Sequence, residues 1–215
     1  MIRAHISEMA VEEVANAVTH GVGLVLSVIG FVVLMSFAVL YGDKWQLAAS
    51  AVYGTCLVVL YAASTMYHTA IEPGRKTVLK LLDHCCIYLL IAGSYTPFLL
   101  TVLREIGGGM MIFVWLFAAI GIGLKIAFRE RLEWLGIMLY LGMGWAGILM
   151  IKPLYDALGG VALALVVAGG VSYTFAMIFF GWHRIRHHHA IFHIFILGGS
   201  VLHYVAIMTY LIPRG

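Results

Sequence analysis

Long apolar runs alternate with short polar or glycine-rich breaks along this chain. Each run approaches the ~20 apolar residues that a helix needs to cross a bilayer. Charged residues, glycines and prolines separate the runs, as at 42–44 and 72–76. The pattern predicts an all-α membrane protein, a single seven-transmembrane helix bundle that occupies residues 1–215. The expected spans are about 17–41, 46–69, 80–103, 109–127, 134–152, 157–181 and 189–212.

Composition supports the membrane assignment. The 215 residues are 63% apolar and only 11% charged, whereas a soluble domain is about 45–50% apolar and about 25% charged. A soluble globular protein is therefore excluded. The three cysteines lie in apolar runs and are expected to be buried thiols, so a disulfide scaffold is excluded too. The net charge of +3 is small and spread out, and it does not indicate a nucleic-acid partner.

The distribution of basic residues predicts an orientation. Seven spans place the termini on opposite sides, with nine Lys and Arg residues on the N-terminal side and four on the other. The nine are Arg3, Arg75, Lys76, Lys80, Lys125, Arg129, Arg131, Arg184 and Arg186, and the four are Lys44, Arg104, Lys152 and Arg214. Because cytoplasmic loops carry the excess of positive charge, we expect the N-terminus in the cytoplasm and the C-terminus outside.

Several polar residues stand where an apolar run begins or ends. They occur at the start of the first, third and seventh spans and at the end of the second, and alternating span direction brings all four groups to one depth near the cytoplasmic surface. They are Glu13, Asn16 and His20; Ser64 and His68; Asp83 and His84; and His187, His188, His189 and His193. Ionisable groups at membrane depth are costly, so each is a candidate functional residue.

The histidine spacing suggests a metal site. His189 and His193 are four residues apart, so they share one helix face with Cβ atoms about 5–6 Å apart. Both imidazoles can then reach one metal ion, and His68 would complete a three-histidine set with an open fourth position, as in catalytic zinc sites. Asp83 could bind a water there, orient a ligand histidine or act as a general base.

The histidines also have simpler interpretations. An isolated histidine near a helix end usually lies among lipid headgroups, and this interpretation fits His84, His187 and His188. His203 lies deeper, about 21 Å along the helix from His189, and we expect it to form a helix–helix hydrogen bond. Three imidazoles would also suit first-row ions other than zinc.

The same residues carry a resemblance to a known family. The chain resembles the bacterial hemolysin III family, which belongs with the progestin and adipoQ receptors, including the adiponectin receptors. The motifs are E-x-x-N-x-x-T-H at 13–20, S-x-x-x-H at 64–68, Asp83 and H-x-x-x-H at 189–193. The stretches LDHCCIYLLIAGSYTPFLL and HAIFHIFILGGSVLH are the most diagnostic, and the similarity runs from about residue 10 to the C-terminus.

The resemblance implies a seven-helix bundle with its N-terminus inside, in the bacterial cytoplasmic (inner) membrane. It further implies a zinc ion held by His68, His189 and His193, with Asp83 close to a zinc-bound water. Ser64 matches a serine of the wider group, which includes the alkaline ceramidases and is proposed to comprise membrane hydrolases.

Three functions follow as hypotheses. The first is a zinc-dependent, ceramidase-like hydrolase of a lipid amide or ester bond, with Asp83 moving the proton and Ser64 stabilising the water or the oxyanion. The second is a non-enzymatic membrane-homeostasis protein with a structural zinc. The third is a pore-forming, cytolytic hemolysin, which would need a polar stripe along a whole helix. The partner in the first two is a membrane lipid, as substrate or ligand.

Overall fold

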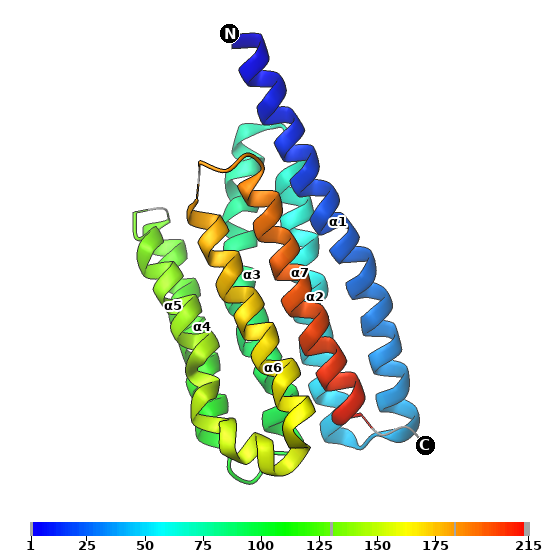
Figure 1. Cartoon of the computed structure of the whole chain (residues 1–215). Coiled ribbons are helices and arrows are strands. Elements are labelled where there is room, and N and C mark those ends of the chain that lie inside the picture. Colours follow the sequence, from blue (N-terminus) through cyan, green and yellow to red (C-terminus); the bar gives the residue numbers. More distant parts are fainter. Residues whose placement is uncertain (1, 130, 183, 213–215) are drawn as a thin grey trace.

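The computed structural model describes residues 2–129, 131–182 and 184–212, with side chains from residue 11 onward. The arginines at 3 and 214, used in the charge comparison, lie outside the described side chains. Within the described part every regular element is a helix, which confirms the all-α prediction (Figure 1). The elements are α1 (Ile2–Tyr41), α2 (Lys44–Thr69), α3 (Pro73–Leu100), α4 (Gly108–Phe128), α5 (Glu133–Trp145), the 3₁₀ helix η1 (Ala146–Met150), α6 (Ile151–Gly181) and α7 (His188–Tyr210).

Six helical stretches are long and apolar enough to cross a membrane, so the protein is a multi-pass membrane protein. Five of them match predicted spans one for one. The sixth, Glu133–Gly181, has 49 residues and covers both 134–152 and 157–181. The membrane-spanning character is thus confirmed, while the count of seven stays a prediction.

The 49-residue stretch is not one straight helix. At about 1.5 Å per residue it would be about 74 Å long, more than twice the ~30 Å hydrocarbon core. Gly159 interrupts it with φ 81° and ψ 177°, a conformation that glycine adopts without steric cost. Figure 1 shows α5 and the later part of α6 running in opposite directions on either side of this turn.

Side-chain caps fix where α2 and α3 begin. The Asp43 carboxylate accepts hydrogen bonds from the backbone N–H groups of Trp45 (2.7 Å) and Gln46 (2.9 Å). The Glu72 carboxylate accepts from the N–H groups of Arg75 and Gly74, and these bonds lower the pKa of that carboxyl group. Capping at Glu72 sets the start of α3 and hence the depth of Asp83 along it.

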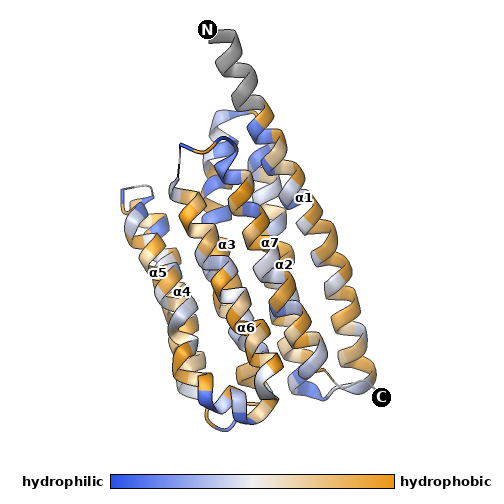
Figure 2. Cartoon of the chain, viewed as in Figure 1, coloured by the Kyte–Doolittle hydropathy of each residue, from blue (hydrophilic) through white to orange (hydrophobic). Residues whose placement is uncertain are grey.

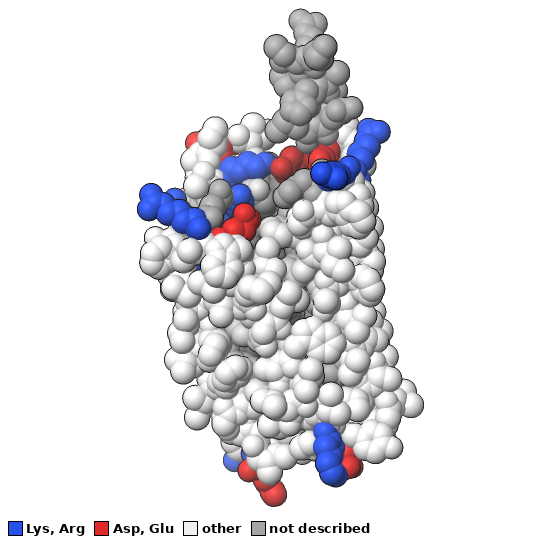
Figure 3. Space-filling model, turned by 60° about the vertical axis from the view of Figure 1, so that its left-hand side comes forward, with Lys and Arg blue, Asp and Glu red and all other residues white. Residues whose placement is uncertain are grey.

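The helices pack with their apolar side chains both inside and outside. α1 packs on α2 and α7, α2 on α3, α3 on α4, and α6 on α7. Large apolar side chains also cover the outside; Ile112, Leu149 and Val161 are each at least 66% exposed. Charged residues gather at the two ends, with an uncharged band between them on the face shown in Figure 3. This is the surface expected of a chain surrounded by hydrocarbon.

The two ends of the bundle differ in chemistry. The α2–α3, α4–α5 and α6–α7 connections lie at the end where α1 begins (Figure 1). Hydrophilic residues of α1, α2, α3 and α7 meet near that end (Figure 2). The fold therefore gathers the polar span ends predicted above; which end faces the cytoplasm stays a prediction from charge.

Candidate metal centre

Three histidines converge at the polar end of the bundle. His68 comes from the last turn of α2, and His189 and His193 come from the first turns of α7. One ring nitrogen of each lies within 4.8 Å of the others. The ring centroids are 5.1 Å apart for His68 and His189, 5.0 Å for His68 and His193, and 4.6 Å for His189 and His193. The structure thus brings the three predicted ligands into one cluster.

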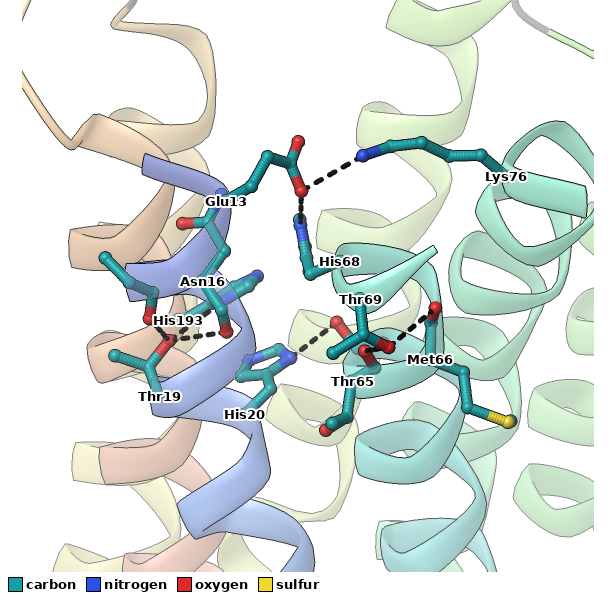
Figure 4. A network of polar contacts seen from close by, with 12 residues as sticks. Glu13, Asn16, Thr19, His20, Thr65, Met66, His68, Thr69, Lys76 and His193 are labelled. Atoms are coloured by element: carbon teal, nitrogen blue, oxygen red, sulfur yellow. Dashed lines mark hydrogen bonds and ion pairs between the residues drawn. The ribbon is translucent and has the colours of Figure 1, made fainter. Parts of the chain in front are cut away.

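A carboxylate fixes the tautomer of His68. The Nδ1–H of His68 donates to Oε2 of Glu13 at 2.9 Å, because a carboxylate can only accept (Figure 4). Lys76 forms an ion pair with the same oxygen at 3.2 Å. The lone pair of His68 is therefore on Nε2, which is buried and has no hydrogen-bond partner among the described residues. A carboxylate behind the imidazole is the usual support for a metal-bound histidine.

A hydroxyl group fixes the tautomer of His193. The Thr19 hydroxyl lies 2.9 Å from the backbone carbonyl oxygens of both Ala15 and Asn16, and its single hydrogen is directed to them. It therefore accepts from Nδ1–H of His193 at 3.1 Å. This leaves Nε2 of His193 with the lone pair. Nε2 of His189 is also buried without a partner in the described chain.

A buried nitrogen lone pair without a partner costs free energy unless it accepts a hydrogen bond or binds a cation. The donor set therefore fits a metal ion that accepts nitrogen ligands, and zinc fits it well. The fit rests on the bonded Nδ1 groups of His68 and His193 and on the unpartnered Nε2 atoms of His68 and His189, which leave nitrogens available for a metal.

Comparison with known proteins agrees with these motifs. The family described as "Haemolysin-III related" matches residues 9–204. The chain belongs to this family. It is 42% identical over 200 residues to "Hemolysin-3 homolog" of Bacillus subtilis (strain 168), covering 93% of this chain and 94% of that protein. It is 41% identical over 203 residues to "Hemolysin-3" of Bacillus cereus, with 94% and 93% covered. It is 32% identical over 211 residues to "Monocyte to macrophage differentiation factor" of Homo sapiens, with 93% and 84% covered.

In this haemolysin-III-related chain, Ser64 and Asp83 lie together beside the histidines. Ser64 is 1% exposed and Asp83 is 9% exposed. The Ser64 hydroxyl is close enough to the Asp83 carboxyl group to act as its hydrogen-bond partner. Both line one cavity with His189, so a carboxyl group and a hydroxyl group are available next to the histidine cluster.

The sequence did not assign roles to Glu13, Thr19 and His20. His20 stacks on His193 with ring centroids 3.4 Å apart, and its Nδ1 lies 2.6 Å from the Ser64 hydroxyl oxygen. The spacing E-x-x-N-x-x-T-H does place Glu13, Asn16 and His20 on one helix face. The spacing therefore shows that these residues share a face. It does not show that the face points into the bundle, because the rotation of α1 about its axis depends on packing.

Two predictions about other histidines had different outcomes. His203 was expected to bond to a neighbouring helix, and its Nε2 does donate to the Val166 carbonyl of α6 at 3.0 Å. His84 was expected among headgroups, which is wrong: it is 7% exposed, and its Nδ1 lies 2.6 Å from the Lys80 carbonyl. Tyr140 of α5 bonds to the His84 carbonyl at 2.9 Å, so α5 covers this part of α3.

An apolar cavity leads from the polar end into the bundle. Its volume is about 180 Å³, and it passes between α3, α5, α6 and α7. Ser64, Asp83 and His189 line its polar end, and residues such as Leu90 and Ile196 line its walls. The arrangement can place an apolar chain inside the bundle with a polar group at the histidine cluster.

Proposed function

We propose that this protein is a zinc-dependent hydrolase that cleaves an amide or ester bond of a membrane lipid. The observation that carries the proposal is the juxtaposition of three converging histidines, two of them with a buried and unpartnered Nε2 among the described residues, a buried carboxyl–hydroxyl pair and an apolar cavity. Metal ligands alone would fit many roles. Their position at the polar end of an apolar cavity favours an amphipathic substrate.

His68, His189 and His193 would hold the zinc, and Glu13 and Thr19 would keep two of them in the correct tautomer. A zinc ion there would supply a Lewis acid that polarises a carbonyl and makes water more acidic. The remaining chemistry belongs to side chains of this chain.

Asp83 would accept the proton when water adds to the carbonyl carbon. It would return that proton to the nitrogen or oxygen of the leaving group as the C–N or C–O bond breaks, so the products are a carboxylic acid and an amine or alcohol. Ser64 would donate its hydroxyl hydrogen to the oxygen that becomes negative. His20, bonded to Ser64 at 2.6 Å, would orient that hydroxyl.

The proposal includes the membrane arrangement. Seven spans, with α5 and α6 crossing separately, would place the histidine cluster near the cytoplasmic leaflet of the bacterial inner membrane. The lipid would enter the cavity sideways from the bilayer.

A second candidate is a structural metal in a non-enzymatic membrane-homeostasis protein. One observation favours it: Nε2 of His20 is a further buried imidazole nitrogen without a partner among the described residues, next to His193. If His20 closed the ligand set, no position would remain for water, as is usual in structural zinc sites.

The test is lipid turnover by purified wild-type protein and by Asp83→Asn, with bound metal measured in both. The proposal expects release of free fatty acid by wild type and loss of at least about 100-fold in rate in Asp83→Asn with metal retained. Asp156→Asn is the control and should keep full activity, because this exposed carboxylate of α6 pairs with Lys152 and does not line the cavity. If a broad set of lipid amides and esters stays intact while metal is bound, the hydrolase proposal fails and the structural metal is favoured.

A further inference from the structure

The cavity has a second polar position far from the histidine cluster. His203 lies on α7, ten residues after His193 and therefore about 15 Å further along the helix axis. It lines the same cavity as Ser64 and Asp83. The metal centre makes no use of it, and the helix–helix bond to Val166 accounts for only one of its two ring nitrogens.

The tautomer of His203 follows from that bond. Nε2 lies 3.0 Å from the Val166 carbonyl oxygen, which can only accept, so Nε2 carries the hydrogen. A neutral imidazole then has its lone pair on Nδ1. Nδ1 of His203 is buried and has no hydrogen-bond partner among the described residues. Nδ1 of His203 is therefore a hydrogen-bond acceptor that lacks a donor among the described residues.

The ring is held in this position by packing. Gly169 of α6 has no side chain, and a Cβ there would lie 2.3 Å from Cδ2 and 2.4 Å from Nε2 of His203. The ring of Tyr173 contacts it edge-on, with centroids 5.4 Å apart. His203 is thus fixed between α6 and α7 and cannot turn Nδ1 toward another protein group without losing the Val166 bond.

Outside the histidine cluster, other polar groups of the cavity wall have their own partners. Ser94, Tyr95 and Thr174 line the cavity and donate their hydroxyl hydrogens to backbone carbonyls at 2.7–2.9 Å. Tyr173 is 3.0 Å from the Ser200 hydroxyl. Since these groups are engaged, none of them supplies a hydrogen to Nδ1 of His203, and a molecule in the cavity that His203 lines is a candidate donor. A lone water is a poor candidate, because it needs two to four polar partners.

We propose that His203 is a second recognition site, which binds a hydroxyl or N–H group carried by the apolar part of the ligand. The ligand would then have two polar features, one at the histidine cluster and one about 15 Å further along the cavity. This inference rests on the proposed function in one respect, that the cavity binds a lipid. It does not require that the protein hydrolyses the lipid.

The experiment measures binding of matched fatty acids to the full-length wild-type protein in detergent, by displacement of radiolabelled octadecanoic acid. The competitors are octadecanoic acids with one hydroxyl group at successive positions along the chain, and the methyl ether of each. Fatty acids contain no bond for the enzyme to cleave, so an absence of hydrolysis does not affect the result.

The proposal expects one hydroxyl position to bind about three- to tenfold more tightly than the unsubstituted acid, as one net hydrogen bond allows. The methyl ether at that position, which has no hydrogen to donate, should lose this gain. His203→Phe should abolish the preference, and Ser94→Ala, in the same cavity, should keep it.

The proposal is overturned if no hydroxyl position is preferred, if the ether binds as tightly as the alcohol, or if His203→Phe keeps the preference. It is also overturned if none of the fatty acids binds, since the cavity would then not be a lipid site. The comparison of alcohol with ether uses wild-type protein alone and decides the matter even if His203→Phe does not fold.

Discussion

Glu13→Ala removes the carboxylate that accepts the Nδ1–H of His68 at 2.9 Å. His68 could then adopt its other tautomer or rotate, and either change would withdraw Nε2 from the histidine cluster. Loss of such a carboxylate behind a metal-bound histidine typically costs about 10- to 100-fold in metal affinity. The side chain of Glu13 is 37% exposed whereas that of His68 is 2% exposed. Because water can partly replace the carboxylate, we expect the lower end, about tenfold or about 1.4 kcal/mol.

The assay is competition for zinc between the purified protein and a chromophoric chelator. Glu13→Gln keeps an oxygen that can accept from Nδ1–H and should lose less affinity than Glu13→Ala. Glu12→Ala removes the neighbouring carboxylate of α1 and should match wild type, because it is Glu13 that accepts from His68. Unchanged zinc affinity in Glu13→Ala would refute the argument that this carboxylate fixes the tautomer of His68.

Three further predictions test separate parts of the account. Ser64→Ala should lower the turnover number by about 10²- to 10³-fold while the zinc content, measured by mass spectrometry, stays at the wild-type level; equal turnover would exclude its role at the oxyanion. Gly169→Ala should lower the melting temperature through an overpacking cost of about 1–3 kcal/mol, whereas Gly170→Ala, which has open space around the added Cβ, should not; equal melting temperatures would contradict the packing described. Cysteines introduced at Arg131 and Lys152 should react with membrane-impermeant reagents from opposite sides of the membrane, and labelling from one side would contradict a separate crossing by α5.

The sequence predicted helix positions well where breaks are sharp, and less well where a charged residue starts a helix. The predicted span 80–103 begins seven residues after α3 does, because the charged stretch that follows Glu72 resembles a loop. In the structure Glu72 is the cap and Pro73 the first helical residue, a common combination at helix starts. The chain between 152 and 157 was predicted as a break, but the helix continues there and turns at Gly159 instead.

The sequence also predicted part of the candidate site, namely which histidines lie at one depth. The alternating direction of the spans predicted that His68, His189 and His193 lie at one depth. The four-residue spacing predicted that His189 and His193 share one helix face. The rotation of each helix about its own axis was not predictable from one sequence. For this reason the inward face of α1, with Glu13 and His20, and the coverage of His84 by α5 emerged only from the packing.

The central claim is that His68 and His193 ligate one ion, and metal analysis of the purified protein tests it most directly. We predict about one zinc per chain in wild type and its loss in both His68→Ala and His193→Ala. His187→Gly is the matched control, because it removes a neighbouring imidazole at a position whose φ of 57° suits glycine, and it should keep the metal. Wild-type protein without bound metal, or full metal content in both alanine variants, would contradict the claim.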